Sequence, residues 1–522
     1  MTANHRPFRR QVLLNTLSSG AANGWAMLVA LATVPLLLKG LGTTAFGTWA
    51  LLQTFSATTG WLSIVDLGVI LGTTRDVAAR ASKGDAREIR SVVTASLVLC
   101  SGLGLAAGFV LALLGPRLLA DLFRTPASLL PEFRVAVVMF AIQVVFDMII
   151  NSFEASLEGI QRVDLSRFVD MSRRVLVLGS ASVAALVTEN LAAAAGAAMA
   201  GCAVASLLAF LVLRAQLPKP FSRPEREEAR RLLRESRAIA LMRPVAVLRR
   251  TMDRIVVGVI LGPAAVALVE IASQLYQAAD AVMGAFVYSV IPAASWLRSR
   301  DDRTSLAELA ERGTKYSLLA TMPGVTAIAV LSGPIVALWL GPKYAEAAGL
   351  ATVAVLNVAA NAPLGVGSQM LVGLGRARAV LRCDAISVAV NVVASVSLVH
   401  AVGIVGTFIG SIIGSLVLTA LLLPPVLEET GLGLRHFTRA SLFPALPPSV
   451  AMAAAAGAVL LLPLGSFLTV LLGGLFGLVV FVLVARQWSL EGSEVGELRA
   501  LLQRATGQPP PGAQPETSAP SA

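Results

Sequence analysis

The chain has 522 residues, of which 56% are hydrophobic and only 14% are charged, a composition that excludes a soluble globular protein. Apolar runs of about 20 residues, the length that crosses a bilayer, recur from end to end. The formal net charge of +11 would suit a nucleic-acid-binding protein. However, the basic residues cluster in particular connections between the apolar runs, so we expect a polytopic membrane protein with no nucleic-acid partner.

The apolar runs predict an all-α membrane protein of about fourteen transmembrane helices. The predicted spans are approximately 13–38, 46–71, 92–114, 135–157, 168–187, 191–213, 238–262, 264–292, 315–340, 347–372, 379–400, 403–426, 443–463 and 466–486. Most connections between them are short, which is typical of neighbouring antiparallel helices.

The placement of the basic residues predicts the orientation of these spans. One set of alternate connections carries only five of the 42 basic residues: Lys39, Arg117, Arg124, Arg134 and Lys343. The others lie at the N-terminus, in the remaining connections and in the span 238–262. Because basic residues accumulate on the cytoplasmic side of a membrane, we expect both termini in the cytoplasm.

A short internal repeat predicts the domain organisation. Residues 41–45 (LGTTA) match residues 261–265 (LGPAA), and each match ends an odd-numbered span and opens the next. We therefore expect two six-helix lobes around a central cavity. The expected domains are an N-terminal lobe (1–217), a basic cytosolic linker (218–237), a C-terminal lobe (238–427), two extra helices (428–486) and a cytosolic, largely disordered tail (487–522). The linker should contain a short amphipathic helix, which either rests on anionic headgroups or forms a solvated connector.

The span 238–262 is unusually charged for a membrane helix. At about 100° per residue, Arg243, Arg250 and Arg254 fall along one line about 16 Å long. An arginine at a helix centre costs about 2.5–3.5 kcal/mol, so such residues usually face a cavity or a partner. The alternative is a span that starts near Ile255, but its apolar part would be too short to cross the membrane. We therefore favour the cavity.

The fourth span carries polar residues at helical spacing. Asp147, Asn151, Glu154 and Glu158 share one face. They could pair with the arginines of 238–262 across the cavity, or take up protons during transport. The alternative is a structural pairing with Arg162, Arg167 or Arg173 near the cytosolic end.

Four polar residues in later spans complete the candidates for a polar cavity: Glu270, Gln274, Asn357 and Asp384. They are candidates for substrate contact or ion coupling. Polar side chains in membrane helices equally often bond neighbouring helices, so both interpretations stay open.

No catalytic or metal-binding pattern is visible. His5, His400 and His436 are scattered without ligand spacing, and no phosphate-binding glycine loop is present. We expect neither an enzyme nor a cofactor or metal site.

Three segments resemble a known family. They are LLLKGLGTTAFGTWALLQTFSATTGWLSIVDLG (36–68), LEGIQRVDLSRF (157–168) and MDRIVVGVILGPAAVALVEIAS (252–273). They are similar to the polysaccharide-export (O-antigen-type) flippases of the multidrug/oligosaccharidyl-lipid/polysaccharide exporter superfamily. The resemblance covers most of residues 11–427, and its loose motifs agree in order and spacing.

The resemblance implies a transporter of the bacterial cytoplasmic membrane. Such a protein flips an undecaprenyl-pyrophosphate-linked oligosaccharide by alternating access for polysaccharide biosynthesis. Its partners would be the lipid-linked oligosaccharide, membrane lipids, a polysaccharide polymerase and glycosyltransferases. A buried pyrophosphate needs paired cations, so Arg243, Arg250 and Arg254 are the predicted headgroup site. Asp66, in the family-like DLG, is a predicted gate or structural pairing residue.

Three alternatives remain open. A multidrug or cation antiporter of the same superfamily would need an acidic, aromatic cavity, whereas only 6% of the residues are aromatic. A lipid II-type flippase would use the two extra helices to accommodate the lipid tail. A polysaccharide polymerase or ligase would need a large outer loop, and only 115–134 approaches that size.

Overall fold

The computed structural model describes residues 8–223, 226–240, 243–287, 290–490 and 494; for 8–21, 23, 235–240 and 285–286 it describes the backbone alone. Within these residues the chain is almost wholly helical and contains no strand. The predicted all-α fold class is therefore confirmed.

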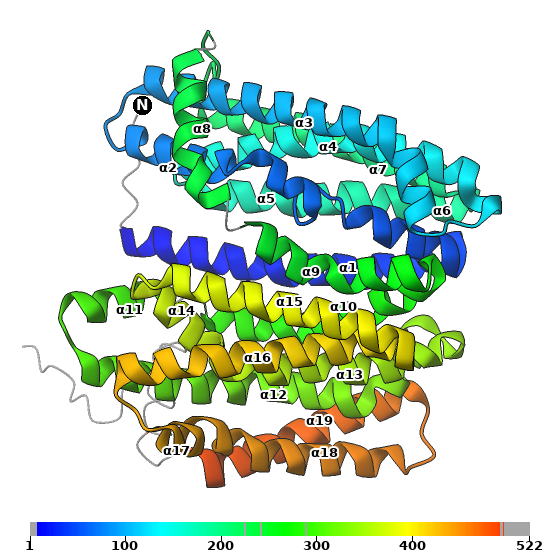
Figure 1. Ribbon diagram of the computed structural model, residues 1–522, viewed down its shortest axis with the longest axis vertical. Helices are drawn as coiled ribbons and strands as arrows, with labels where there is room; N and C mark the ends of the chain where they lie inside the picture. Colours follow the sequence, from blue (N-terminus) through cyan, green and yellow to red (C-terminus); the bar gives the residue numbers. More distant parts are fainter. Residues whose placement is uncertain (1–7, 224–225, 241–242, 288–289, 491–493, 495–522) are drawn as a thin grey trace, which may run out of the picture.

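The first group of helices, α1 to α7, forms the upper layers of Figure 1, and we call it the N-terminal bundle. Its helices are α1 (Phe8–Gln53), η1 (Trp61–Asp66), α2 (Val69–Ala81), α3 (Ala86–Leu122), α4 (Leu130–Gly159), α5 (Val163–Arg174), η3 (Val175–Gly179), α6 (Ser180–Thr188) and α7 (Leu191–Gln216). A separate helix, α8 (Arg226–Ala240), leads to the second group.

The second group, here the C-terminal bundle, fills the lower layers of Figure 1. Its helices are α9 (Arg243–Ile260), α10 (Pro263–Val287), α11 (Val290–Ser299), α12 (Arg303–Leu340), α13 (Ala345–Asn361), α14 (Gly365–Gly373), α15 (Ala377–Val402) and α16 (Val405–Thr430). The chain continues through α17 (Leu434–Phe437), α18 (Leu446–Leu460) and α19 (Ser466–Val484), and α18 and α19 pack on each other and on α12.

The helices run between two ends of the molecule. The connection from α2 to α3 and helix α11 lie toward the left of Figure 1, and we call this side the basic end. At the other side, here the turn end, glycines with positive φ close tight turns at Gly42, Gly262, Gly341 and Gly403. Glycine is suited to these turns because it lacks the Cβ that disfavours positive φ.

Eleven described segments are long and apolar enough to cross a membrane, which makes the chain a multi-pass membrane protein. Ten of them coincide with predicted spans, and the first, Gly24–Gln53, contains part of the span 13–38 and the start of 46–71. The spans 238–262 and 264–292 have no counterpart among them, so the count of fourteen is not confirmed.

The predicted span 46–71 is not one continuous helix. Residues 46–53 end α1, and the helix is interrupted before η1 and α2. Side-chain hydroxyls bond to nearby carbonyls on both sides of the interruption, since Thr54 donates to the Leu51 carbonyl and Ser63 to the Gly60 carbonyl. Serine, threonine and glycine favour such local bonds over helix continuation.

The predicted spans 238–262 and 264–292 each include two residues outside the described part. Residues 238–240 end α8, residues 241–242 lie outside the described part, and α9 begins at Arg243. The second span is covered by α10 and α11, with 288–289 outside the described part. In α9 the charged residues replace the apolar run that a lipid-facing span requires.

The internal repeat marks the place where the two bundles touch. Gly42 and Gly262 occupy equivalent turns, with φ of 75° and 85°. Just after the first turn, a Cβ at Gly47 would lie 1.8 Å from the Pro263 carbonyl oxygen. Only glycine permits this approach, so α1 and α10 meet backbone to backbone near the turn end.

The linker helix α8 packs against the N-terminal bundle instead of forming a solvated connector. Leu232 is fully buried, and Glu228 forms an ion pair with Arg80 at 2.7 Å. The linker backbone at Ser222 also donates to the Thr94 hydroxyl at 2.9 Å. The amphipathic pattern of this segment therefore serves packing onto α2 and α3.

Acidic caps begin two long helices at the basic end. Asp85 accepts hydrogen bonds from the backbone N–H groups of Glu88 and Arg87 at the start of α3. Asp302 accepts one from Ser305 at the start of α12. These bonds hold the pKa of both exposed carboxyls below the usual value, because they stabilise the ionised form.

The predicted tail 487–522 is described only for 487–490 and 494. Glu494 is buried and forms an ion pair with Lys315 of α12 at 2.8 Å. The Tyr316 hydroxyl also donates to Glu494 at 2.7 Å. At this residue the chain therefore returns to α12; the other tail residues lie outside the described part.

Candidate functional site

Helix α9 lies beside α1, between the layers of the two bundles (Figure 1). It carries five charged residues: Arg243, Arg249, Arg250, Asp253 and Arg254. Each of them has a different environment, and these environments decide which side chains are available to a ligand.

Arg243 connects the two bundles. Its guanidinium donates to the Asp66 carboxylate of η1 and, at 2.9 Å, to the Ser63 carbonyl. Asp66 is almost fully buried and also accepts a hydrogen bond from the Gly68 backbone N–H. The structure thus joins two residues that the sequence suggested for different roles.

Arg254 is paired within the C-terminal bundle. Its Nε lies 2.6 Å from Glu270 Oε2 of α10. The N–H does not point at that oxygen, which has no hydrogen-bond partner, so the contact is an ion pair only. Gln274 donates to the other Glu270 oxygen at 2.6 Å. Glu270 therefore supplies a counter-ion to the predicted phosphate-binding stripe.

Arg250 is exposed and has no hydrogen bond or ion pair among the residues that the structure describes. Its positive charge, like that of Arg249, attracts the Asp280 carboxylate of α10. Of the three predicted phosphate ligands, Arg250 is thus the one whose guanidinium is available without breaking an ion pair.

Arg249 is a residue that the sequence interpretation left out. It donates to Asp384 of α15 and to Asn361 of α13, both at 3.1 Å. Asp384, a predicted cavity residue, therefore anchors α9 to α15. Another predicted residue, Asn357, accepts from the Ser415 hydroxyl of α16 at 2.7 Å, a helix-to-helix bond of the structural kind.

Asp253 is the second residue that the sequence interpretation left out. It accepts hydrogen bonds from the hydroxyls of Thr407 and Ser411 on α16 at 3.0 and 2.9 Å. No ion pair to Asp253 occurs within the described ranges. Asn391 and Ser395 of α15 continue the network, since Asn391 donates to Ser411 and accepts from Ser395. A carboxylate held by neutral oxygen groups is suited to binding a proton or a hard cation.

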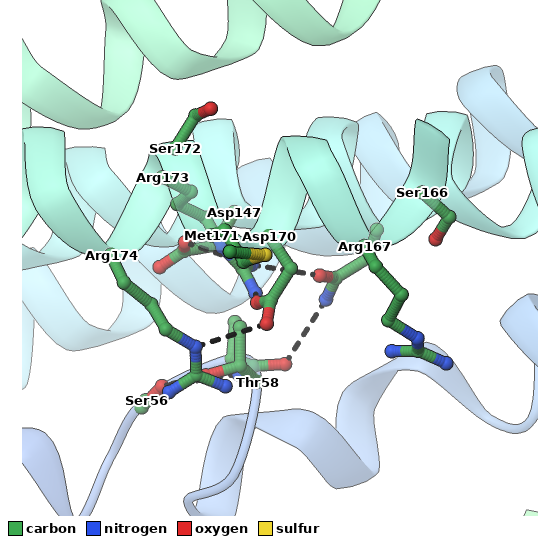
Figure 2. Close-up of polar contacts among 12 residues, drawn as sticks. Ser56, Thr58, Asp147, Ser166, Arg167, Asp170, Met171, Ser172, Arg173 and Arg174 are labelled. Atoms are coloured by element: carbon green, nitrogen blue, oxygen red, sulfur yellow. Dashed lines mark hydrogen bonds and ion pairs between the residues drawn. The ribbon is translucent and has the colours of Figure 1, made fainter. Parts of the chain in front are cut away.

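The polar face of α4 lies inside the N-terminal bundle and pairs with α5. Arg173 donates to Asp170 at 2.6 Å and to Asn151 at 3.2 Å, and it lies 3.7 Å from Asp147. Figure 2 shows Asp170 between the guanidinium groups of Arg173 and Arg174. Arg173 is therefore a buried cation shared by carboxylates of two helices.

The contacts of this cluster show which of the suggested ion pairs the α4 carboxylates form. Asp147 pairs with Arg173 of its own bundle and not with the arginines of α9. Glu158 pairs with Arg167 at 3.0 Å, as the structural alternative predicted. Glu154 differs from both, because its buried Oε1 has no hydrogen-bond partner in the described part of the chain. A role of Glu154 in ion coupling stays a prediction.

The described residues contain no group of three or more His, Cys, Asp or Glu side chains that could hold a metal ion. Cys100 and Cys202 are buried thiols, and Cys383 is partly exposed. Among the described residues, the site offers one guanidinium without an ion pair, that of Arg250, several paired charges, and one carboxylate, that of Asp253, held by two hydroxyl groups.

Comparison with protein families identifies the family of the chain. The family model described as polysaccharide biosynthesis protein matches residues 12–297, more than half of the sequence. The chain belongs to this polysaccharide biosynthesis protein family. The resemblance drawn from the sequence is thereby confirmed. A search among curated proteins found no match.

Solved structures show the same fold. The chain is similar to a lipid II flippase MurJ in an inward closed conformation, with 13% identity and a TM-score of 0.70. That match covers 94% of this chain and 100% of the flippase. An inward-facing multidrug resistance MATE family transporter of the MOP superfamily matches with 17% identity and a TM-score of 0.62, covering 78% of this chain and 95% of its own.

An outward-facing MATE transporter of the MOP superfamily is also similar, with 16% identity and a TM-score of 0.53. It covers 81% of this chain and 96% of its own. These solved proteins are a flippase and transporters, not enzymes. At such low identities they establish the shared fold of this polysaccharide biosynthesis family member.

Proposed function

We propose that this protein flips an undecaprenyl-pyrophosphate-linked oligosaccharide across the bacterial cytoplasmic membrane by alternating access. The observation that carries the proposal is the exposed guanidinium of Arg250 on the helix between the two bundles, which has no ion pair with any residue that the structure describes. Arginine forms bidentate hydrogen bonds with phosphate oxygens, and such bonds favour a pyrophosphate headgroup.

The lengths of the matches favour a lipid flippase over a drug antiporter. The match to the flippase extends over 94% of this chain. The match to the MATE transporter extends over only 78% of this chain, although it includes 95% of the transporter. The chain also carries two helices, α18 and α19, after the two six-helix lobes that the sequence predicts. A long lipid substrate gives such helices a use that a small cation does not.

The other arginines of α9 join the phosphate site in a second step of the proposal. Arg243 and Arg254 become available when Asp66 and Glu270 release them, so the two carboxylates act as internal substitutes for phosphate. Asp66 thereby serves as a gate residue between the bundles. Under the positive-inside rule the basic end faces the cytosol, where glycosyltransferases would supply the lipid-linked substrate, and a polymerase would use it outside.

The decisive experiment reconstitutes the purified full-length protein in liposomes with a fluorescent undecaprenyl-pyrophosphate-linked oligosaccharide. A membrane-impermeant reagent that attacks the sugar reports its appearance in the outer leaflet. We expect protein-dependent translocation of this lipid and no transport of a cationic dye under the same gradients.

Other outcomes would support the alternatives instead. Dye transport without lipid translocation would identify an antiporter. Equal translocation of lipid II would identify a lipid II-type flippase. Lengthening or transfer of the glycan chain would identify a polymerase or ligase.

Asp253 is the group that we propose to couple transport to an ion gradient. Replacing Asp253 with asparagine should remove the response of lipid translocation to whichever gradient, proton or sodium, drives the parent protein, because the amide takes up neither ion. Translocation is measured with each gradient imposed in turn. Asp121→Asn, at an exposed position, serves as control, and an undiminished gradient response of Asp253→Asn would contradict the role.

A further inference from the structure

A proline in α1 leaves one backbone carbonyl without its helical partner. Pro35 lies inside the helix and has no N–H group, so it cannot donate to the carbonyl of Leu31, four residues earlier. A backbone carbonyl that is buried without a partner is costly, and proteins nearly always satisfy it from elsewhere.

The partner of the Leu31 carbonyl comes from the other bundle. The indole Nε1 of Trp339, in the last turn of α12, donates to Leu31 O at 2.7 Å. The ring packs, partly buried, against the largest apolar cluster of the molecule. This hydrogen bond is directional and joins α1 of the N-terminal bundle to α12 of the C-terminal bundle.

The apolar residues around this hydrogen bond show that the two bundles pack against each other at the turn end. The C-terminal-bundle residues that join the largest apolar cluster include Val336, Ala347, Val399 and Phe408, all from helix ends near the turn end. Toward the basic end, residues such as Leu306, Leu371 and Leu422 form a separate cluster. Among the side chains that the structure describes, the apolar core is therefore continuous between the bundles at the turn end only.

Two further contacts close the same end. Gly47 lies against the Pro263 carbonyl, and Arg124 donates to the Ile260 carbonyl at 3.2 Å. The fold also matches the inward-facing MATE transporter better than the outward-facing one, with TM-scores of 0.62 and 0.53. Opening the turn end requires all these contacts to separate.

We propose that the hydrogen bond from Trp339 to the carbonyl freed by Pro35 is a latch that holds the turn end closed. Apolar contacts tolerate sliding, whereas a hydrogen bond breaks over a short movement. Its loss therefore favours the state in which the turn end is open. The latch rests on alternating opening of the bundles but not on the identity of the substrate.

The test measures opening directly. Spin labels replace the exposed residues Ala127 and Lys343, one on each bundle at the turn end, in a Cys383→Ala background. Cys100 and Cys202 are fully buried and stay in place. Double electron–electron resonance then gives the distribution of distances between the two spin labels. With Trp339→Phe we expect the ratio of long to short distances to rise about five-fold, as the loss of one such bond predicts.

Matched variants separate the hydrogen bond from packing. Trp25→Phe removes an indole that donates to Met171 within the N-terminal bundle, and it should leave the distances unchanged. Pro35→Ala returns a helical donor to the Leu31 carbonyl, so Trp339→Phe should have a smaller effect in that background.

Three results would overturn the latch. They are unchanged distances in Trp339→Phe, equal effects of Trp339→Phe and Trp25→Phe, and an undiminished effect in the Pro35→Ala background. Because the distances are measured without substrate, failure of the latch is distinguishable from failure of the proposed transport.

Discussion

Replacing Arg173 with methionine is expected to destabilise the N-terminal bundle strongly. The methionine fills similar space but leaves Asp147 without its cation and Asp170 with Arg174 as its remaining counter-ion. Breaking a buried ion pair in this way costs about 3–5 kcal/mol. The expected result is a large fall in the Tm of the purified protein in detergent and a lower yield of folded protein.

The chain offers a matched control for this prediction. Arg167 lies on the same helix, but its ion pair with Glu158 is about one third exposed, with side-chain exposures of 36% and 29%. Arg167→Met should therefore cost about 1 kcal/mol or less. Replacing Asp147 and Asp170 with asparagine in the Arg173→Met variant should recover part of the lost stability. Equal Tm values for Arg173→Met and Arg167→Met would contradict the buried-cation interpretation.

Replacing Arg250 with alanine is expected to reduce lipid-linked oligosaccharide transport while the protein keeps its stability. No ion pair with Arg250 exists among the described side chains, so its removal breaks none, and the Asp280 carboxyl keeps the nearby charge of Arg249. A hydrogen bond to a charged group contributes about 1.5–3 kcal/mol, which corresponds to at least a ten-fold loss of apparent affinity. Transport in liposomes at increasing substrate concentration measures this loss.

Two further variants sharpen the result. Arg250→Lys should transport at an intermediate level, because an ammonium group keeps the charge but not the planar fork of the guanidinium. Arg230→Ala removes an exposed arginine from α8 and should transport normally. If Arg250→Ala retains full affinity, or if Arg230→Ala is equally impaired, α9 does not hold the phosphate through Arg250.

Arg243 and Arg254 should behave differently from Arg250. Each has a carboxylate partner, so removing either guanidinium leaves Asp66 or Glu270 uncompensated. Loss of activity in these variants would therefore combine lost stability with lost binding. Only the exposed Arg250 gives a measurement in which the two are separate.

The sequence by itself determined the class of the protein, most of its helices and its family. Eleven spans follow from runs of apolar residues, because the cost of placing polar groups in lipid acts on every residue locally. The turns at Gly42 and Gly262 are similarly visible, because a positive φ favours glycine wherever it occurs. The family motifs lie in the same segments.

The tertiary structure decided which charges are already compensated. Periodicity placed Arg243, Arg250 and Arg254 on one line of a helix, yet their environments differ. Arg243 pairs with Asp66 of η1, and Arg254 pairs with Glu270 of α10. Arg249 and Asp253 were missed as site residues for the same reason. An ion pair needs a few ångströms of separation in space, and helical spacing fixes only which residues share a face, not which distant helix packs against it.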